Sequence, residues 1–296
     1  MKKSLFLSVL VLLLAACSSE TGVPADETQA NTATAGTAQE IPPAGTSLAD
    51  VIADQRRNES RARDKWRHPL ETLSFIGVEP DMTIVEVLPG NGGWYTQILG
   101  PFTAEQGRLI GLTYPQSLWS QMFSDWGEHR YEQFGADVTQ FGRYLSVEGV
   151  ERARPIVGYT IDAIPDEENG QADAVLFIRA MHHLFRFEEP LIDTALSEVF
   201  DVLAPGGVVG VVQHRAPEEA DAEFANGNNG YLKQSDVIAA FERAGFVLEE
   251  TSEVNANPND PADGPVWRLP PSTTDNPETM NIGESDRMTL RFRKPM

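Results

Sequence analysis

Short β-rich runs alternate with helical patterns from residue 82 onward, and this alternation constrains the fold more than any other feature of the sequence. It is typical of a parallel sheet that carries helices on both faces. The predicted strands span residues 83–88, 108–114, 155–161, 174–179, 208–213, 246–254 and 288–292. The sequence therefore predicts a doubly wound, Rossmann-like α/β fold around a mostly parallel, seven-stranded sheet.

Two segments between these strands carry apolar residues at helical spacing. Residues 191–203 are expected to form one helix, with Pro190 in its first turn and Pro205-Gly206-Gly207 ending it. A second helix is expected from Ser235, as its N-cap, to Gly245. The Pro/Asn/Asp-rich segment 255–285 separates the last two strands, and a loop of that length is either functional or poorly ordered.

The chain begins with two lysines and a short apolar run, residues 5–14, which is too short for a permanent membrane helix and typical of a removed signal. Leu14-Ala15-Ala16-Cys17 resembles the lipobox of bacterial lipoproteins, in which the cysteine is acylated. An ordinary signal peptide with an incidental cysteine is the alternative. Cys17 is the only cysteine, so the mature protein can form no internal disulfide. Ser18 resembles lipoproteins sorted to the outer membrane, which implies a lipid-anchored protein of the cell envelope that faces the periplasm.

These features divide the chain into three parts. Residues 1–16 are the expected signal peptide, and residues 17–46, almost without large apolar side chains, are expected to form a flexible tether. Residues 47–296 have the size of one domain. This domain opens with a helical extension, in which 48–67 is a charged, helix-competent stretch and 70–76 a further helix.

The formal net charge is −21. Such a field repels polyanions at long range, so we expect no nucleic-acid partner. Solubility is the simplest meaning of the charge, and attraction of a cationic ligand is the alternative. We expect a monomer or a weak oligomer with a small-molecule partner.

A glycine-bearing turn, Glu86-Val-Leu-Pro-Gly-Asn-Gly-Gly93, follows the first strand. Open α/β sheets bind ligands at this carboxyl edge, and glycine lets the backbone approach a ligand closely. Dinucleotide binding would require a small residue where Tyr95 stands and an acidic residue where Thr113 ends the second strand. The turn therefore favours a different nucleotide cofactor.

Four segments together resemble the class I S-adenosylmethionine-dependent methyltransferases, and more closely a group of predicted bacterial methyltransferases, many of which carry export signals. The resemblance covers about residues 60–296. It implies the class I methyltransferase type of seven-stranded sheet, with S-adenosylmethionine as the cofactor. The segments are RDKWRHP at 63–69, EVLPGNGGWY at 86–95, LAPGG at 203–207, and SDR at 285–287 with KP at 294–295.

The resemblance also implies which residues bind the cofactor. Leu88 replaces the first glycine of the family loop, and Thr113 replaces the acidic residue that holds the ribose hydroxyls in most members. The Thr113 hydroxyl can make only an uncharged hydrogen bond. Asp162 matches the position near the adenine amine, with a turn carboxylate as the alternative. The full set of expected cofactor-binding residues is Glu86, Pro89, Gly90, Gly92, Trp94, Tyr95, Thr113, Asp162 and Arg179; Trp94 and Tyr95 either wall the pocket or simply pack at the start of the helix.

The fourth strand ends at Arg179 and leads into His182 and His183, at the edge where class I enzymes bring cofactor and acceptor together. Methyl transfer depends on positioning, and only a protonated nucleophile needs a base. His182 or His183 could be that base. The alternative is that one histidine caps the strand end and the other is exposed. Adjacent side chains diverge and no motif offers a third ligand, so no metal is expected.

Three other parts of the sequence are candidates for the acceptor side of the site. Arg67 and His68 could belong to a lid or form a structural corner, His214 follows the fifth strand, and the 255–285 segment could cover the acceptor. The leading hypothesis is an envelope-tethered methyltransferase with a small-molecule acceptor. The alternative is a non-catalytic, ligand-binding lipoprotein that retains the fold.

Overall fold

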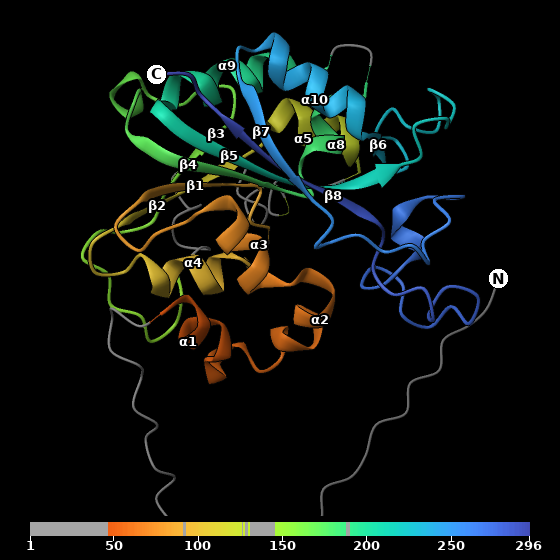
Figure 1. Ribbon diagram of the computed structural model, residues 1–296, viewed down its shortest axis with the longest axis horizontal. Helices are drawn as coiled ribbons and strands as arrows, with labels where there is room; N and C mark the ends of the chain where they lie inside the picture. Colours follow the sequence, from red (N-terminus) through yellow and green to blue (C-terminus); the bar gives the residue numbers. More distant parts are fainter. Residues whose placement is uncertain (1–46, 91–92, 126, 128–129, 131–145, 188–189) are drawn as a thin grey trace, which may run out of the picture. The chain divides into compact units, whose positions relative to one another are not determined.

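The computed structural model describes residues 47–90, 93–125, 127, 130, 146–187 and 190–296 (Figure 1). The expected signal peptide, the lipidation site Cys17, the tether and Gly92 lie outside these residues. Within them, no helix has both the length and the apolar character needed to cross a membrane.

Seven strands form the main sheet in the order β3-β2-β1-β4-β5-β8-β7, and the short β6, Leu232–Lys233, pairs with β5. Only β8 runs against its neighbours β5 and β7; the other pairings in this order are parallel. The predicted seven-stranded, mostly parallel sheet is therefore confirmed. Its strands are β1 Thr83–Val87, β2 Arg108–Thr113, β3 Val157–Thr160, β4 Ala172–Ile178, β5 Leu203–Ala216, β7 Val247–Ser252 and β8 Arg287–Arg293.

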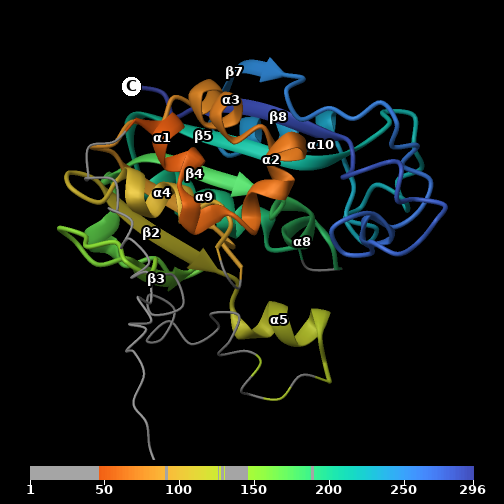
Figure 2. The same cartoon turned by 90° about the horizontal axis from the view of Figure 1, so that it is seen from below.

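Helices cover both faces of the sheet (Figures 1 and 2). One face carries α1 Leu48–Ala53, α3 Pro69–Ile76 and α4 Thr96–Phe102, with α2 Asp64–Arg67 beside them. The other carries α5 Gln116–Met122, α8 Met181–Phe185, α9 Ile192–Val202 and α10 Gln234–Arg243. Short 3₁₀ helices span Gln55–Arg57, Ser60–Arg63, Asp166–Glu168 and Val266–Arg268.

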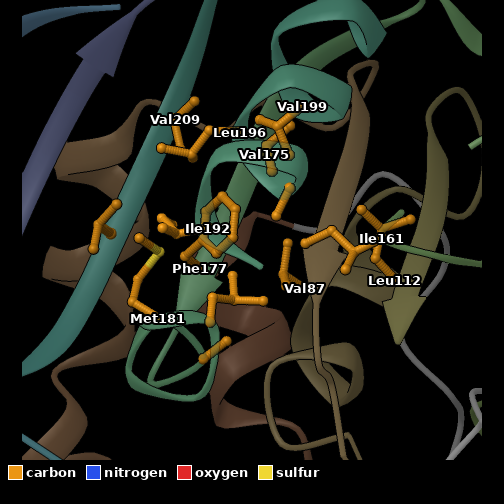
Figure 3. Packing of buried hydrophobic residues seen from close by; sticks show 14 of the residues in the cluster. Val87, Leu112, Ile161, Val175, Phe177, Met181, Ile192, Leu196, Val199 and Val209 are labelled. Atoms are coloured by element: carbon orange, nitrogen blue, oxygen red, sulfur yellow. The ribbon is translucent and has the colours of Figure 1, made fainter. Parts of the chain in front are cut away.

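Alternation along the strands builds two cores. Val175 and Phe177 of β4 pack in the larger cluster, beneath α9 residues such as Leu196 (Figure 3), whereas Ala174 and Leu176 pack in the cluster on the opposite face. A strand sends successive side chains to opposite faces, so a strand buried on both sides is apolar throughout.

The chain adds β2 and β3 on one side of β1 and then adds β4 and β5 on the other side, so the order of the strands switches direction at β1. Val87, the last residue of β1, pairs with Leu112 of β2 on one side and with Phe177 of β4 on the other. The carboxyl ends of these strands therefore lie at one level. Crevices at such a switch point are where open α/β sheets bind ligands.

The expected stop signal Pro205-Gly206-Gly207 is wrong. Helix α9 already ends at Val202, and β5 begins at Leu203. Leu203 pairs with Ala172, after which the register shifts to Ala174 opposite Val208. The glycines thus lie where the strand is irregular, and Gly206 adopts the positive φ of +78° that this irregularity requires.

The expected N-cap Ser235 is also wrong. Helix α10 begins at Gln234, and the Ser235 backbone N–H donates to Glu218 Oε1 at 3.1 Å. Glu218, a distant residue, therefore satisfies the helix start. The helix-competent stretch 48–67 forms α1, two 3₁₀ helices and α2. The break after α1 lies at Asp54, whose side chain accepts the Arg56 backbone N–H at 2.8 Å.

Candidate active site

A cavity of about 610 Å³ lies at the carboxyl edge of the sheet, which is within the usual range for small-molecule sites. Residues at the carboxyl ends of three strands contribute to it. They are Glu86 of β1 with Leu88 just after it, Ile178 of β4 with Arg179 just after it, and His214 of β5. The 255–285 segment supplies a further wall. Its contributions are Val266, Trp267, Pro270, Pro271, Ser272, Glu284 and Ser285.

The turn after β1 has the backbone that its glycines suggested. Leu88, Gly90 and Gly93 all have positive φ, at +52°, +70° and +42°. A Cβ on Gly90 would meet no heavy atom within 4 Å, so this part of the turn is open. A Cβ on Gly93 would lie 2.4 Å from Thr96 Oγ1. Pro89 and Gly90 line the cavity.

Glu86 is buried, with 3% of its surface exposed, and accepts a hydrogen bond from Thr96 Oγ1 at 2.6 Å. Burial raises its pKa to about 7, against the opposing effects of the Thr96 hydrogen bond and Arg67. At neutral pH this carboxyl is therefore poised between its two protonation states. A cationic ligand group beside it would favour the charged form.

Trp94 and Tyr95 line the cavity and also pack against the helical extension. The guanidinium carbons of Arg57 and Arg67 lie 4.9 and 4.5 Å from the Trp94 ring centre, and its Nε1 donates to the Ser60 carbonyl at 3.1 Å. The Tyr95 hydroxyl donates to the Arg67 carbonyl at 3.4 Å. Trp94 and Tyr95 therefore both line the cavity and pack against the residues before α3.

Thr113 is fully buried at the end of β2, and its hydroxyl accepts a hydrogen bond from Trp119 Nε1 at 3.3 Å. Trp119 lines the cavity, whereas Thr113 does not. Asp162 also lies outside the lining. Its Oδ1 is buried, and none of the described residues donates a hydrogen bond to it. A buried carboxylate oxygen without a partner can accept a hydrogen bond from a ligand.

His182 has a defined tautomer. Gln213 Nε2 donates to the Gly230 carbonyl at 2.8 Å, which directs Gln213 Oε1 toward His182 Nδ1, 3.3 Å away. An amide oxygen can only accept, so Nδ1 carries the proton and Nε2 keeps its lone pair.

His183 and His214 complete a cluster of three cavity-lining histidines. Their ring centres lie 3.9 and 5.5 Å from that of His182, and His214 Nδ1 lies 2.5 Å from Ser285 Oγ. Burial lowers the pKa of His182 to about 4 and that of the other two well below the usual value. All three are neutral at neutral pH, and neither His182 nor His183 is exposed. Across the described part of the chain, no three His, Cys, Asp or Glu side chains form a group that could hold a metal ion.

Sequence reasoning missed a buried ion-pair cluster around Glu284. Arg63 Nε lies 2.6 Å, Arg287 Nη1 3.0 Å and Arg67 Nε 3.7 Å from its carboxylate oxygens. Although burial opposes ionisation, these arginines hold the pKa of Glu284 below its usual range. The signal was present in the two motifs, 63–69 and 285–287, but nothing in either pointed to the other.

Arg179 lines the cavity from the end of β4, at φ +59°, an uncommon conformation for a non-glycine residue. Burial lowers its pKa to about 10, so it stays charged at neutral pH. Among the residues that the structure describes, none forms a hydrogen bond or an ion pair with its guanidinium.

No family model matches the chain, and no curated protein is significantly similar to it. Solved structures with a similar fold include a methyltransferase from Aquifex aeolicus (13% identity, 84% of this chain and 99% of that one, TM-score 0.46). A second is geranyl diphosphate C-methyltransferase from Streptomyces coelicolor (14% identity, 86% of this chain and 86% of that one, TM-score 0.47). A third is an arsenic(III) methyltransferase from Chlamydomonas reinhardtii (15% identity, 87% of this chain and 75% of that one, TM-score 0.45). All three are described as S-adenosylmethionine-dependent or are bound to the demethylated cofactor. Likeness at this level says nothing of the activity of this chain.

The strand order and the single reversed strand β8 identify the fold itself. A parallel sheet with this order, the antiparallel β8 inserted between β5 and β7, and a glycine turn after β1 are the features of the class I methyltransferase type of sheet that was expected from the sequence. The chain has this Rossmann-like fold, preceded by the helical extension α1 to α3.

Proposed function

We propose that the protein is an S-adenosylmethionine-dependent methyltransferase that acts on a small-molecule acceptor. The observation that carries this proposal is one cavity that brings together Glu86, the open turn at Gly90 and the neutral His182. These groups come from the ends of β1 and β4, the edge at which this fold class binds its ligands.

The residues present fit the cofactor. Glu86 would accept its ammonium group, and the open backbone at Gly90 would allow close approach. Asp162 lies outside the cavity lining, and its buried Oδ1 would accept the adenine amine of a ligand that reaches beyond that lining. Pro89, Trp94 and Tyr95 would complete the walls, with Gly92 in the same turn of the sequence. Arg179, at the end of β4, would lie between the cofactor and the acceptor. The Thr113 hydroxyl already accepts a hydrogen bond from Trp119, and Thr113 would face the ribose only from behind the cavity lining. When bound, the cofactor supplies an electrophilic methyl group.

His182 would act on the acceptor. Its Nε2 lone pair is free to take a proton from a hydroxyl or a similar nucleophile, while Gln213 fixes the ring through Nδ1. His183 is the second candidate base, because its Nδ1 is buried without a partner among the described residues.

We also propose that the protein is tethered in the cell envelope through a lipid on Cys17 and faces the periplasm, as a monomer or weak oligomer. The support is the charged and apolar start of the sequence with its lipobox-like ending.

One observation favours a second function, that of a non-catalytic ligand-binding lipoprotein. The ribose side of the cavity presents Trp119 in front of Thr113, where most class I enzymes have a carboxylate. Such a wall would bind ribose hydroxyls less tightly, and the cavity could hold another small ligand.

Calorimetric titration of the full chain with S-adenosylmethionine and S-adenosylhomocysteine separates the two functions. We expect micromolar binding that is lost in Gly90→Val. Gly170→Val is the matched control, because Gly170 has the same φ of +70° and equally open surroundings at the opposite edge of the sheet. A folded chain that binds neither compound, or a Gly90→Val variant that binds as well as the control, would contradict the proposal.

A further inference from the structure

The cavity has more positive than negative charge, although the chain as a whole carries −21. Arg63, Arg67 and Arg179 line it, and Arg287 joins them through Glu284. The only carboxylates among the lining residues that the structure describes are Glu86 and Glu284. Since the pKa of Glu86 is about 7, its carboxyl is only partly ionised at neutral pH and only partly balances the arginine charges.

The existing ion pairs do not use up this charge. Glu284 is shared among Arg63, Arg67 and Arg287, and the Arg63 Nη2 donor remains buried without a partner within the described residues. Arg179 makes no hydrogen bond or ion pair with any of them. A buried donor such as Arg63 Nη2 is costly unless a ligand satisfies it.

S-adenosylmethionine cannot supply the missing negative charge. Its carboxylate is balanced by its ammonium group, and its sulfonium adds one positive charge, so the loaded cavity would be more positive still. The negative field of the whole protein repels anions at a distance, but it is screened by salt over about 10 Å. Inside the cavity, where the dielectric is low, the nearby arginines dominate.

The rest of the lining is apolar and aromatic. Trp119 and Phe123 form part of one wall, and Trp267, with 49% of its surface exposed, and Pro270 and Pro271 form another. Such walls suit a flat, apolar ligand body.

We infer that the acceptor is an organic acid with an apolar or aromatic body, whose anionic group is held by Arg179 and Arg63. This inference rests on the proposed methyltransferase function and names its substrate class. The acid serves as the anchor, because an oxygen paired with arginine is a poor nucleophile. The methyl-accepting atom is then a second group on the same molecule, next to the histidines.

The test uses the full chain saturated with S-adenosylhomocysteine and titrated calorimetrically with benzoate and with benzamide, its neutral analogue of nearly the same shape. We expect benzoate to bind at least about tenfold more tightly, as one charge-assisted contact would give. Arg179→Gln should reduce benzoate binding to the level of benzamide. Arg243→Gln, at an exposed arginine of α10, should leave it unchanged.

The outcomes separate the inference from the function on which it rests. If S-adenosylhomocysteine does not bind, both fail. If it binds but benzoate and benzamide bind equally or not at all, only the inference fails. It fails as well if saturation with S-adenosylhomocysteine abolishes benzoate binding, because the arginines then serve the carboxylate of the cofactor. Arg63→Gln, which leaves Arg287 on Glu284, provides the same comparison should Arg179→Gln not fold.

Discussion

Glu86 shows how one buried residue sets the behaviour of the site. Within the described residues, its carboxyl accepts one side-chain hydrogen bond, from Thr96, and it lies in a core position of β1. Burial raises its folded-state pKa from 4.5 to about 7. The stability associated with this shift is fully present below pH 4.5 and is lost as the pH rises through 7, because the folded protein must then bury a charge.

Glu86→Gln should therefore stabilise the protein more at pH 8 than at pH 5, by about 2 kcal/mol. The amide is neutral at both values, and its oxygen can still accept from Thr96. Urea unfolding at the two pH values measures the difference. Glu105→Gln, at an exposed position, reports the general effect of removing one negative charge. A gain that is equal at the two pH values would show that Glu86 does not titrate in this range.

Single residues were predictable where their role depends on position along a strand. Glu86, Gly90, Arg179 and His182 were expected at the carboxyl edge, because each follows or ends a buried apolar run, and the cavity contains all four. Their partners were not predictable. Gln213, which fixes the tautomer of His182, lies on β5 and meets it only through the pairing of β5 with β4.

At the scale of elements, the 255–285 segment is an ordered wall held by named contacts. The side-chain amide of Asn257 donates to the carbonyls of Ile282 and Glu284 at 2.8 and 2.6 Å, and Asp286 accepts the Asn257 backbone N–H at 2.7 Å. These bonds close the segment on itself and present Glu284 to the arginines of the helical extension. The wall and the helical extension therefore depend on the same carboxylate.

Glu284→Ala should destabilise the protein by about 3–5 kcal/mol, because it leaves three arginines close together without their shared carboxylate. Glu250→Ala removes an exposed partner of Arg291 and should cost less than about 1 kcal/mol. Urea unfolding of both variants at neutral pH makes the comparison. Equal losses would show that the cluster does not hold the wall in place.

The strands were predictable as elements because alternation and apolar runs are local signals. Two local signals were misleading for the same reason. Pro205-Gly206-Gly207 has the composition of a turn, yet pairing with β4 includes it in β5. Serine is a residue type favoured at the N-cap, but here the Glu218 carboxylate accepts a backbone N–H at the start of the helix instead. Tertiary contacts decided both cases.

At the scale of the molecule, the sequence predicted the fold but not the charge of its cavity. Arg63 and Glu284 are 221 residues apart, and only the complete sheet brings β8 and the helical extension together. Net charge, which is −21, pointed to a cationic ligand as one alternative. The local arrangement of arginines indicates the opposite for the acceptor.

The central claim is that the crevice after β1 binds an adenosyl cofactor. A crystal structure of the full chain grown with S-adenosylhomocysteine tests it most directly. The account predicts the ligand in the cavity, with its amine on Glu86 and its chain along the turn at Gly90. A cavity filled by the protein's own side chains, or a ligand bound only elsewhere, would contradict it.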